Sequence, residues 1–237
     1  QPGRLWLQME SGAPAYLHLY RSDNAGGSWQ EIPTGGTPMS ASPASSLPVA
    51  SDPRFPGGLW IGSNRGLYHT TDAGQTWEHI GGGLPPTMPI DGLAVSPFDE
   101  QRLLAWRNES GLYASDDGGR AWQHSPIPFF GQYTCRATFD PLDRLHIYLA
   151  CNADVYASDD GGRTWSNGAG RIGVTGILAS AGHPGLAYLV GRNRKVSDFL
   201  PHGEVFRTTD GGATWQPWAG GDMLASDTIV AIAGVVP

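Results

Sequence analysis

The sequence is poor in lysine and in long apolar runs. Of its 15 Lys and Arg residues only Lys195 is a lysine, and acidic residues outnumber basic ones to give a formal net charge of −7. This balance argues against a nucleic acid as the main partner, because phosphate backbones recruit cationic surfaces. No apolar stretch reaches the roughly 18 residues that a membrane-spanning helix needs, so we expect a protein that is not transmembrane.

Signatures of catalysis and of cofactor binding are also missing. The seven histidines are scattered without the spacing of metal ligands. The sequence has no nucleophile elbow, no phosphate-binding loop and no dinucleotide fingerprint. We therefore expect neither a metal site nor a cofactor.

Cysteine occurs only twice, at Cys135 and Cys151. The two lie in predicted neighbouring strands whose hairpin centres near residue 143, which places them opposite each other. Opposed strand residues have Cβ atoms about 4.5–5.5 Å apart, slightly beyond the usual disulfide range of about 3.5–4.5 Å. The pattern therefore fits both a disulfide, which would indicate an oxidising compartment, and two buried free thiols. A chain that starts at Gln1, without Met or a signal peptide, adds to the expectation of an exported (secreted, periplasmic or cell-surface) protein.

In contrast, one short pattern is present five times. Each copy opens with Ser or Thr, has Asp (or Asn) two residues later, Gly two residues after that, and Trp three residues further on. The tryptophans lie 48, 45, 43 and 50 residues apart, a period typical of repeat architectures. The key residues of the five copies are Asn24, Gly26 and Trp29; Asp72, Gly74 and Trp77; Asp117, Gly119 and Trp122; Asp160, Gly162 and Trp165; Asp210, Gly212 and Trp215.

These residue types predict a self-contained turn. The Asp side chain accepts hydrogen bonds from backbone N–H groups, Gly permits a left-handed backbone, and we expect the Trp ring to be buried against the hairpin. The pattern resembles the Asp-box, or bacterial neuraminidase repeat (BNR), Ser/Thr-x-Asp-x-Gly-x-Thr/Ser-Trp, from which Asn24 and Ala121 depart. The resemblance implies that each box joins the third and fourth strands of a β-propeller blade at its periphery and has a structural role.

Each repeat also supplies short apolar or alternating runs bounded by Gly, Pro, Asn and Asp, the signature of strands. In the third repeat these runs are 91–96, 102–107, 112–115 and 121–125, and the other repeats fit the same template. We therefore predict an all-β fold, a five-bladed β-propeller of four-stranded antiparallel blades in a single domain, 1–237. The expected blades are 1–36 with 227–236, then 44–82, 90–126, 133–168 and 173–219.

The two ends of this template complement each other. The first repeat lacks its inner strand, whereas an apolar run at 228–235 has no blade after it. We predict that this C-terminal strand closes the first blade and thereby removes two exposed sheet edges.

The candidate site is the mouth of the central channel, where the second-to-third strand connections and the starts of the inner strands converge. The connection 192–203 is much longer than its equivalents, and long loops on a rigid scaffold often carry function. The binding candidates are Arg65, Arg107, Glu109, Tyr133, Arg171, Arg192, Arg194 and Lys195. Asp91 and Asp227 are the candidates for a catalytic carboxylate pair.

Two classes of function are compatible with these observations. The chain resembles exported propellers of the photosystem II assembly-factor type, which implies a non-catalytic binding or assembly module with a protein partner. It also resembles sialidases and xyloglucan-cleaving enzymes, which implies a glycan-directed protein, either a glycoside hydrolase or a lectin. Sialidases need an arginine triad, a Tyr–Glu pair and an acid/base carboxylate, and that constellation is missing here. Xyloglucan-cleaving relatives place two catalytic Asp residues between two propellers, whereas this chain supplies only one propeller. We therefore favour the binding module.

Overall fold

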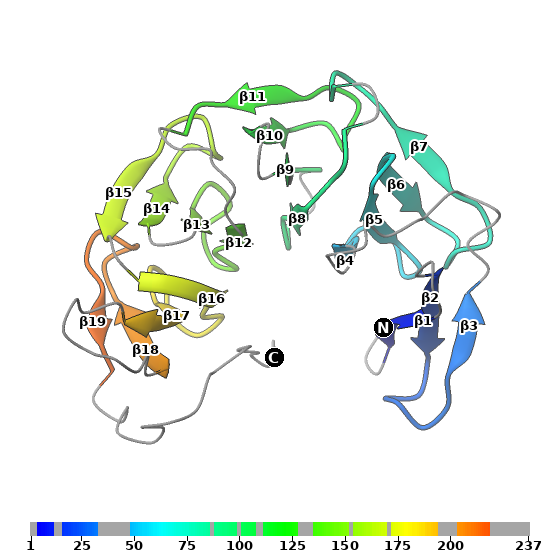
Figure 1. Cartoon of the computed structure of the whole chain (residues 1–237), viewed down its shortest axis with the longest axis horizontal. Helices are drawn as coiled ribbons and strands as arrows, with labels where there is room; N and C mark the ends of the chain where they lie inside the picture. The colour runs from blue at the N-terminus through cyan, green and yellow to red at the C-terminus, as the bar shows by residue number, and fades with distance from the viewer. Residues whose placement is uncertain are drawn as a thin grey trace. The chain divides into compact units, whose positions relative to one another are not determined.

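The computed structural model of the chain describes residues 4–11, 16–32, 48–85, 88–98, 101–107, 111–127, 135–151, 154–169, 172–193 and 203–218. These residues form only strands, turns and loops, arranged in five antiparallel sheets (Figure 1). No helix among them is long and apolar enough to cross a membrane. The chain divides into two compact units, residues 1–107 with 115–123 and residues 108–114 with 124–237.

Each repeat forms one sheet, with its strands hydrogen-bonded in chain order. The first sheet contains β1 (Leu5–Ser11), β2 (Tyr16–Ser22) and β3 (Gln30–Ile32). The second contains β4 (Val49–Ser51), β5 (Leu59–Ser63), β6 (Gly66–Thr70) and β7 (Glu78–Ile80). The third contains β8 (Gly92–Val95), β9 (Leu103–Arg107), β10 (Gly111–Ser115) and β11 (Gln123–Ser125).

The last two sheets are also four-stranded. The fourth contains β12 (Cys135–Phe139), β13 (Ile147–Cys151), β14 (Asp154–Ser158) and β15 (Ser166–Ala169). The fifth contains β16 (Ile172–Ala179), β17 (Ala187–Asn193), β18 (Gly203–Thr208) and β19 (Gln216–Pro217). The all-β class and the antiparallel blades are thus confirmed, while the predicted closing strand at 228–235 lies outside the described residues.

The core lies between neighbouring sheets and is built around their second strands. Every residue of β5 and of β13 is buried. In the first unit, Leu59 and Ile61 of β5 pack with Leu19 and Ile32 of the preceding sheet. In the second unit, Leu189 of β17 belongs to one cluster with residues of the fourth and fifth sheets. Burial of these aliphatic side chains on both faces holds successive blades together, at roughly 25 cal/mol per Å² of apolar surface.

The two cysteines lie directly opposite each other, as the predicted hairpin requires. Cys135 of β12 pairs directly with Cys151 of β13, with Cα atoms 4.1 Å apart, and the two form a disulfide. Of the two alternatives that the spacing left open, the structure therefore has the bonded one. The bridge ties the inner strand of the fourth blade to its second strand.

Candidate functional site

All five boxes form the same type of hydrogen-bonded turn before the last strand of their sheet. In the second box the Thr70 hydroxyl accepts from the N–H groups of Asp72 (3.3 Å) and Gly74 (3.0 Å) and donates to the Asp72 carboxylate (2.7 Å). That carboxylate accepts in turn from the N–H (2.9 Å) and the hydroxyl (2.7 Å) of Thr76. The fourth and fifth boxes repeat this circuit. Each carboxylate is therefore engaged in holding its own turn.

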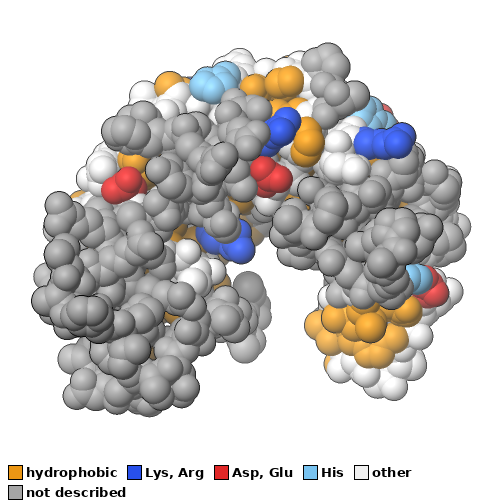
Figure 2. All heavy atoms as spheres, in the orientation of Figure 1, with side chains coloured by type: hydrophobic (Ala, Val, Ile, Leu, Met, Phe, Trp, Pro, Cys, Tyr) orange, Lys and Arg blue, Asp and Glu red, His pale blue; other side chains and the backbone are white. Residues whose placement is uncertain are grey.

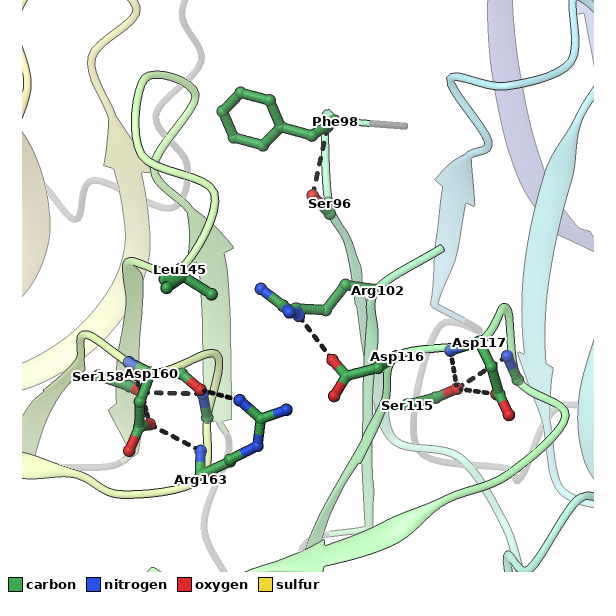
Figure 3. A network of polar contacts seen from close by, with 12 residues as sticks. Ser96, Phe98, Arg102, Ser115, Asp116, Asp117, Leu145, Ser158, Asp160 and Arg163 are labelled. Atoms are coloured by element: carbon green, nitrogen blue, oxygen red, sulfur yellow. Dashed lines mark hydrogen bonds and ion pairs between the residues drawn. The ribbon is translucent and has the colours of Figure 1, made fainter. Parts of the chain in front are cut away.

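The two boxes that depart from the pattern keep the turn by other means. In the first, Asn24 accepts from the Ser28 N–H (2.8 Å) and donates from Nδ2 to the Ser28 hydroxyl (3.0 Å). In the third, Asp117 accepts from the Ala121 N–H (2.9 Å), but Ala121 has no hydroxyl to donate. Figure 3 shows the third and fourth boxes, in which a serine hydroxyl faces the Asp carboxylate across the turn.

These bonds hold the box carboxylates in the charged form. Hydrogen bonds from Thr76 lower the pKa of Asp72 to about 2, and the matching threonine lowers the pKa of Asp210 to about 2. A hydrogen bond from the backbone N–H of Ala121, four residues later, lowers the pKa of Asp117. Burial acts to raise the pKa of Asp160, but its hydrogen bonds outweigh burial and the pKa is lowered. Carboxylates with lowered pKa values are poor proton donors, which argues against an acid–base role for the boxes.

The box glycine lies against the last strand of the preceding sheet. Gly74 has a left-handed φ of +88°, and a Cβ there would overlap the Ile32 side chain of β3. Gly119 has a φ of +85°, and its Cβ would lie 2.7 Å from Cγ2 of Ile80 in β7. In the fourth box the glycine carbonyl accepts a hydrogen bond from Ser125 of β11. The box is therefore a contact between blades as well as a turn.

A second repeated turn connects the first and second strands and is hydrogen-bonded to the box. Both turns lie at the same edge of the sheet, here called the box edge. In this turn, the side chain of the residue that follows the first strand accepts a hydrogen bond from the backbone N–H two positions later. The accepting residues are Asp52, Ser96, Asp140 and Ser180. A box N–H then donates to a carbonyl of this turn at 2.8–3.1 Å, for example Ala73 to Gly57. The sequence carries a signal for this turn, Asp-Pro or Ser-Pro after the strand at 52–53, 96–97 and 140–141, which the strand template did not use.

The tryptophans of the boxes differ in burial. Trp122 is buried, whereas Trp77, Trp165 and Trp215 are half-buried. Trp29 of the first box is 42% exposed, so the expectation that every box tryptophan is buried is wrong for this copy.

A fully buried carboxylate that was not predicted, Asp52, lies at the box edge of the second blade. The Asp52 side chain is fully buried and accepts from Arg54 Nε (2.9 Å) and Trp60 Nε1 (3.2 Å), and it pairs with His69 Nε2 (2.9 Å). Burial acts to raise the pKa of Asp52, but the hydrogen bonds from Arg54 and His69 prevail and hold it well below its usual range. The His69 ring stacks on Trp60 at 3.9 Å. A buried carboxylate with this many partners fixes the local turn geometry.

The predicted mouth corresponds to the opposite edge of the sheets, here called the distal edge, where second and third strands connect. Arg65 is exposed in the turn between β5 and β6, and its carbonyl lies 3.2 Å from the His79 ring. The Ile90 N–H donates to Ser63 of the second blade at 2.9 Å, which brings the start of β8 beside this turn. The Asp91 N–H donates to the Trp106 carbonyl at 2.9 Å, and that register places Asp91 opposite Arg107.

Three of the predicted site residues, Arg65, Asp91 and Arg107, therefore lie at one edge of adjacent blades. Arg192 belongs to β17, where its backbone pairs with Gly173 and Gly203 near the same kind of edge. The remaining candidates lie outside the described residues, namely Glu109, Tyr133, Arg171, Arg194, Lys195 and Asp227. Around the described parts of both edges, no group of three or more His, Cys, Asp or Glu side chains is arranged to hold a metal ion.

Comparison with known families decides what the repeats are. The BNR/Asp-box repeat family matches residues 206–217, which contain the fifth box, and the family described as Sortilin, neurotensin receptor 3 (Sortilin-Vps10) matches residues 65–175. The fifth box is thus part of a BNR/Asp-box repeat, and the other four boxes share its pattern. No curated protein matches it.

Several solved structures share the fold of this chain at low sequence identity. The GH74 enzyme of Niastella koreensis superposes with a TM-score of 0.71 at 19% identity, covering 91% of this chain and 36% of that one. The GH74 xyloglucanase of Xanthomonas campestris gives 0.68 at 18% identity, with the same coverage. YCF48 bound to a D1 peptide gives 0.59 at 18% identity, covering 87% of this chain and 63% of that one. The chain thus spans about a third of the length of the glycoside hydrolases and less than two thirds of YCF48.

Proposed function

We propose that this Asp-box protein is a non-catalytic binding or assembly module that engages a protein partner at the distal edge of its blades. The observation that carries the proposal is the full engagement of the box carboxylates in their own turns, at the opposite edge. Because those side chains are committed to structure, the repeated motif leaves the distal edge for recognition. The arginines found there, Arg65 and Arg107, suit carboxylate groups.

The partner that we propose is a peptide segment bearing carboxylates. The connection 192–203 adds Arg192, Arg194 and Lys195 to the distal edge in the sequence template. A cluster of cations steers acidic partners and binds them through charge-assisted hydrogen bonds. The fold neighbour YCF48 bound to a D1 peptide is a precedent for peptide binding by a protein of this architecture.

A peptide array tests this proposal. The full chain is probed against immobilised synthetic peptides that differ only in their number of Asp and Glu residues. We expect acidic peptides to bind, and binding to be lost when Arg192, Arg194 and Lys195 are all replaced by Glu. The matched control is Arg120→Glu, which reverses a charge that is exposed at the box edge. Equal binding by both variants, or no preference for acidic peptides, would contradict the proposal.

A glycan-directed function is the second candidate, favoured by the two GH74 neighbours. It needs carboxylates facing each other across a pocket, and Asp91 with Asp227 is the pair that the template supplies. The test is hydrolysis or binding of xyloglucan oligosaccharides and of a panel of aryl glycosides. Turnover that disappears in Asp91→Asn and Asp227→Asn, with the fold intact by circular dichroism, would establish the enzyme. Binding without turnover would establish a lectin.

We also propose an exported location for the protein. The disulfide between Cys135 and Cys151 supports it, because such bonds persist in oxidising compartments. Mass spectrometry of the protein purified from its native source, with and without thiol alkylation, tests whether the bond is present there. Quantitative alkylation of both cysteines without prior reduction would count against export.

A further inference from the structure

The fourth blade carries an arginine, Arg136, at a position that other blades fill with glycine or proline. Arg136 lies three residues before Phe139, which ends β12. The residues three places before the ends of β4, β8 and β16 are Pro48, Gly92 and Gly176. The antiparallel registers of the four sheets are aligned at these strand ends. The shared fold therefore does not require a long charged side chain at this level of the sheet.

The guanidinium of Arg136 is exposed and has one hydrogen-bond partner among the described residues. Nη1 donates to the carbonyl of Cys135 at 2.9 Å. A guanidinium has five N–H donors in a planar fork, so most of its donors are open to a ligand. Figure 2 shows a basic side chain at the surface over β12, a strand in which Arg136 is the one cationic residue.

Three arginines at the box edge differ from Arg136, because carboxylates of their own chain neutralise them. The pairs are Arg4 with Asp23, Arg54 with Asp52, and Arg102 with Asp116. Arg136 lies instead next to the distal edge, where Cys135 pairs with Cys151 and the chain turns into β14. No carboxylate of the described ranges forms an ion pair with it. A guanidinium in this state is suited to take a carboxylate from a partner molecule.

The disulfide fixes the backbone group that orients Arg136. Cys135, whose carbonyl accepts from the guanidinium, is bonded to Cys151, and both cysteines are buried. In the third blade the residues at this level are Asp91 and Arg107, so the covalent link is a feature of the fourth blade. A bond at the end of the strand pair restricts the position of the Cys135 carbonyl. The arginine that donates to this carbonyl is thereby held ready for a ligand.

The neighbouring blade of the same compact unit brings the predicted cations towards this arginine. β12 lies beside β16 of the fifth blade (Figure 1). β16 has a β-bulge between Val174 and Gly176, and such irregularities are over-represented next to binding sites. The sheet continues into β17, whose Arg192 pairs with residues at the distal edge and begins the connection 192–203. A ligand at Arg136 is therefore on the side of the molecule where the proposed partner binds.

We propose that Arg136 is the anchor for a side-chain carboxylate of the acidic partner, and that the Cys135–Cys151 disulfide positions it. This inference rests on the proposed function and extends it by naming the residue that binds the Asp or Glu side chain. The guanidinium donates two parallel N–H bonds to the carboxylate. Reduction of the disulfide frees the Cys135 carbonyl and leaves the arginine less ordered. Affinity then falls although the charge of Arg136 is unchanged.

The anchor is tested with a fluorescein-labelled, amidated peptide of alternating Glu and Ala, whose only carboxylates are side chains. Fluorescence anisotropy should show binding about tenfold weaker in Arg136→Gln than in the unaltered chain. Arg136→Lys, which keeps the charge and loses the fork, should give an intermediate affinity. The matched control is Arg207→Gln, an exposed arginine of β18 in the same unit that lies beside the fifth box.

Equal affinities of Arg136→Gln and the unaltered chain would overturn this inference and leave the proposed function standing. Absence of any acidic-peptide binding by the unaltered chain would overturn both. A loss as large in Arg207→Gln would show a general effect of net charge, and would also reject Arg136 as the anchor.

The positioning role is tested by combining reduction with the substitution. Dithiothreitol, which is oxidised as it converts the bond to two thiols, should weaken peptide binding by the unaltered chain roughly 3–10-fold. It should leave the residual binding of Arg136→Gln unchanged, because the group that the bond orients is missing. An equal loss in both proteins would assign the bond a merely structural role. NMR relaxation of the oxidised protein decides even where reduction unfolds the chain, since the Arg136 Nε–H should be more ordered than that of Arg207. Equal mobility of the two groups would refute the positioning.

Discussion

At the scale of single residues, the five boxes are natural variants of one hydrogen-bonded turn. Three of them close the circuit with a threonine hydroxyl on the carboxylate, at 2.6–2.7 Å. The third box has Ala121 at this position, and this residue donates to Asp117 only through its backbone N–H. The copies therefore show which bond each side chain contributes, and the missing hydroxyl of the third box can be restored by one substitution.

We predict that Ala121→Thr stabilises the protein by about 0.5–1 kcal/mol, because the new hydroxyl would donate to a carboxylate that is already in place. The measurement is the midpoint of urea unfolding followed by tryptophan fluorescence. The control is Ala121→Val, which has the same branched shape without the hydroxyl. Equal stabilisation by valine would show that side-chain shape, and not the hydrogen bond, accounts for the gain.

At the scale of elements, the box glycine couples one blade to the next. Gly118 and Gly119 are adjacent and both have a left-handed backbone, with φ of +74° and +85°. The position of Gly118 is held by alanine in two other boxes, Ala25 and Ala73, at φ of +56° and +62°. Only Gly119 faces the packed Ile80 side chain of the preceding sheet.

We therefore expect Gly119→Ala to destabilise the protein by about 1–3 kcal/mol more than Gly118→Ala, because it adds overpacking to a similar backbone strain. Denaturant unfolding of the two variants measures the difference. A further change, Ile80→Ala in the Gly119→Ala background, should recover part of the loss by opening space for the new methyl group. If both single variants lose similar stability, the destabilisation comes from backbone strain alone and not from overpacking.

The disulfide is a second element-scale device, since it joins β12 to β13 across 16 residues of chain. A loop of this length predicts about 3 kcal/mol of stabilisation from the restricted unfolded chain. We expect the Cys135→Ala, Cys151→Ala variant to unfold at a lower urea concentration than the oxidised protein, with the reduced wild type close to the variant. Identical midpoints for oxidised and reduced protein would refute a stabilising role.

The elements were largely predictable from the sequence, and the contacts between them were not. Turn residues delimit each strand locally, so the predicted 66–70 and 134–139 strands agree with β6 and β12 within a residue. The fourth strands begin later than predicted. The reason is that the Thr or Ser before the tryptophan is hydrogen-bonded within the turn, as Thr76 is to Asp72. The buried Asp52 cluster depends on residues up to 17 positions apart that meet only in the folded blade. Local patterns carry no information about such a meeting.

At the scale of the whole molecule, the lowered pKa values of the box carboxylates make stability depend on pH in the acid range. Four boxes, from the second blade to the fifth, carry an Asp whose pKa in the folded state is below the value of 3.8 for an unperturbed Asp. The folded state therefore holds these groups charged where the unfolded chain begins to protonate them. Their contribution is fully present above about pH 4 and is lost as the pH falls towards 2.

We predict that the urea midpoint falls steeply between pH 4 and pH 2, and that the fourfold variant Asp72→Asn, Asp117→Asn, Asp160→Asn, Asp210→Asn shows a flatter profile. Asn24 shows that the turn accepts an amide in place of the carboxylate, so the variant should remain folded. Asp52, whose pKa is also lowered, is kept in both proteins, and a shallow residual slope is therefore expected. The measurement is the urea midpoint by circular dichroism at half-unit pH intervals. If the two profiles run parallel from pH 4 to pH 2, the boxes do not set the acid stability, and the loss must come from other carboxylates of the chain.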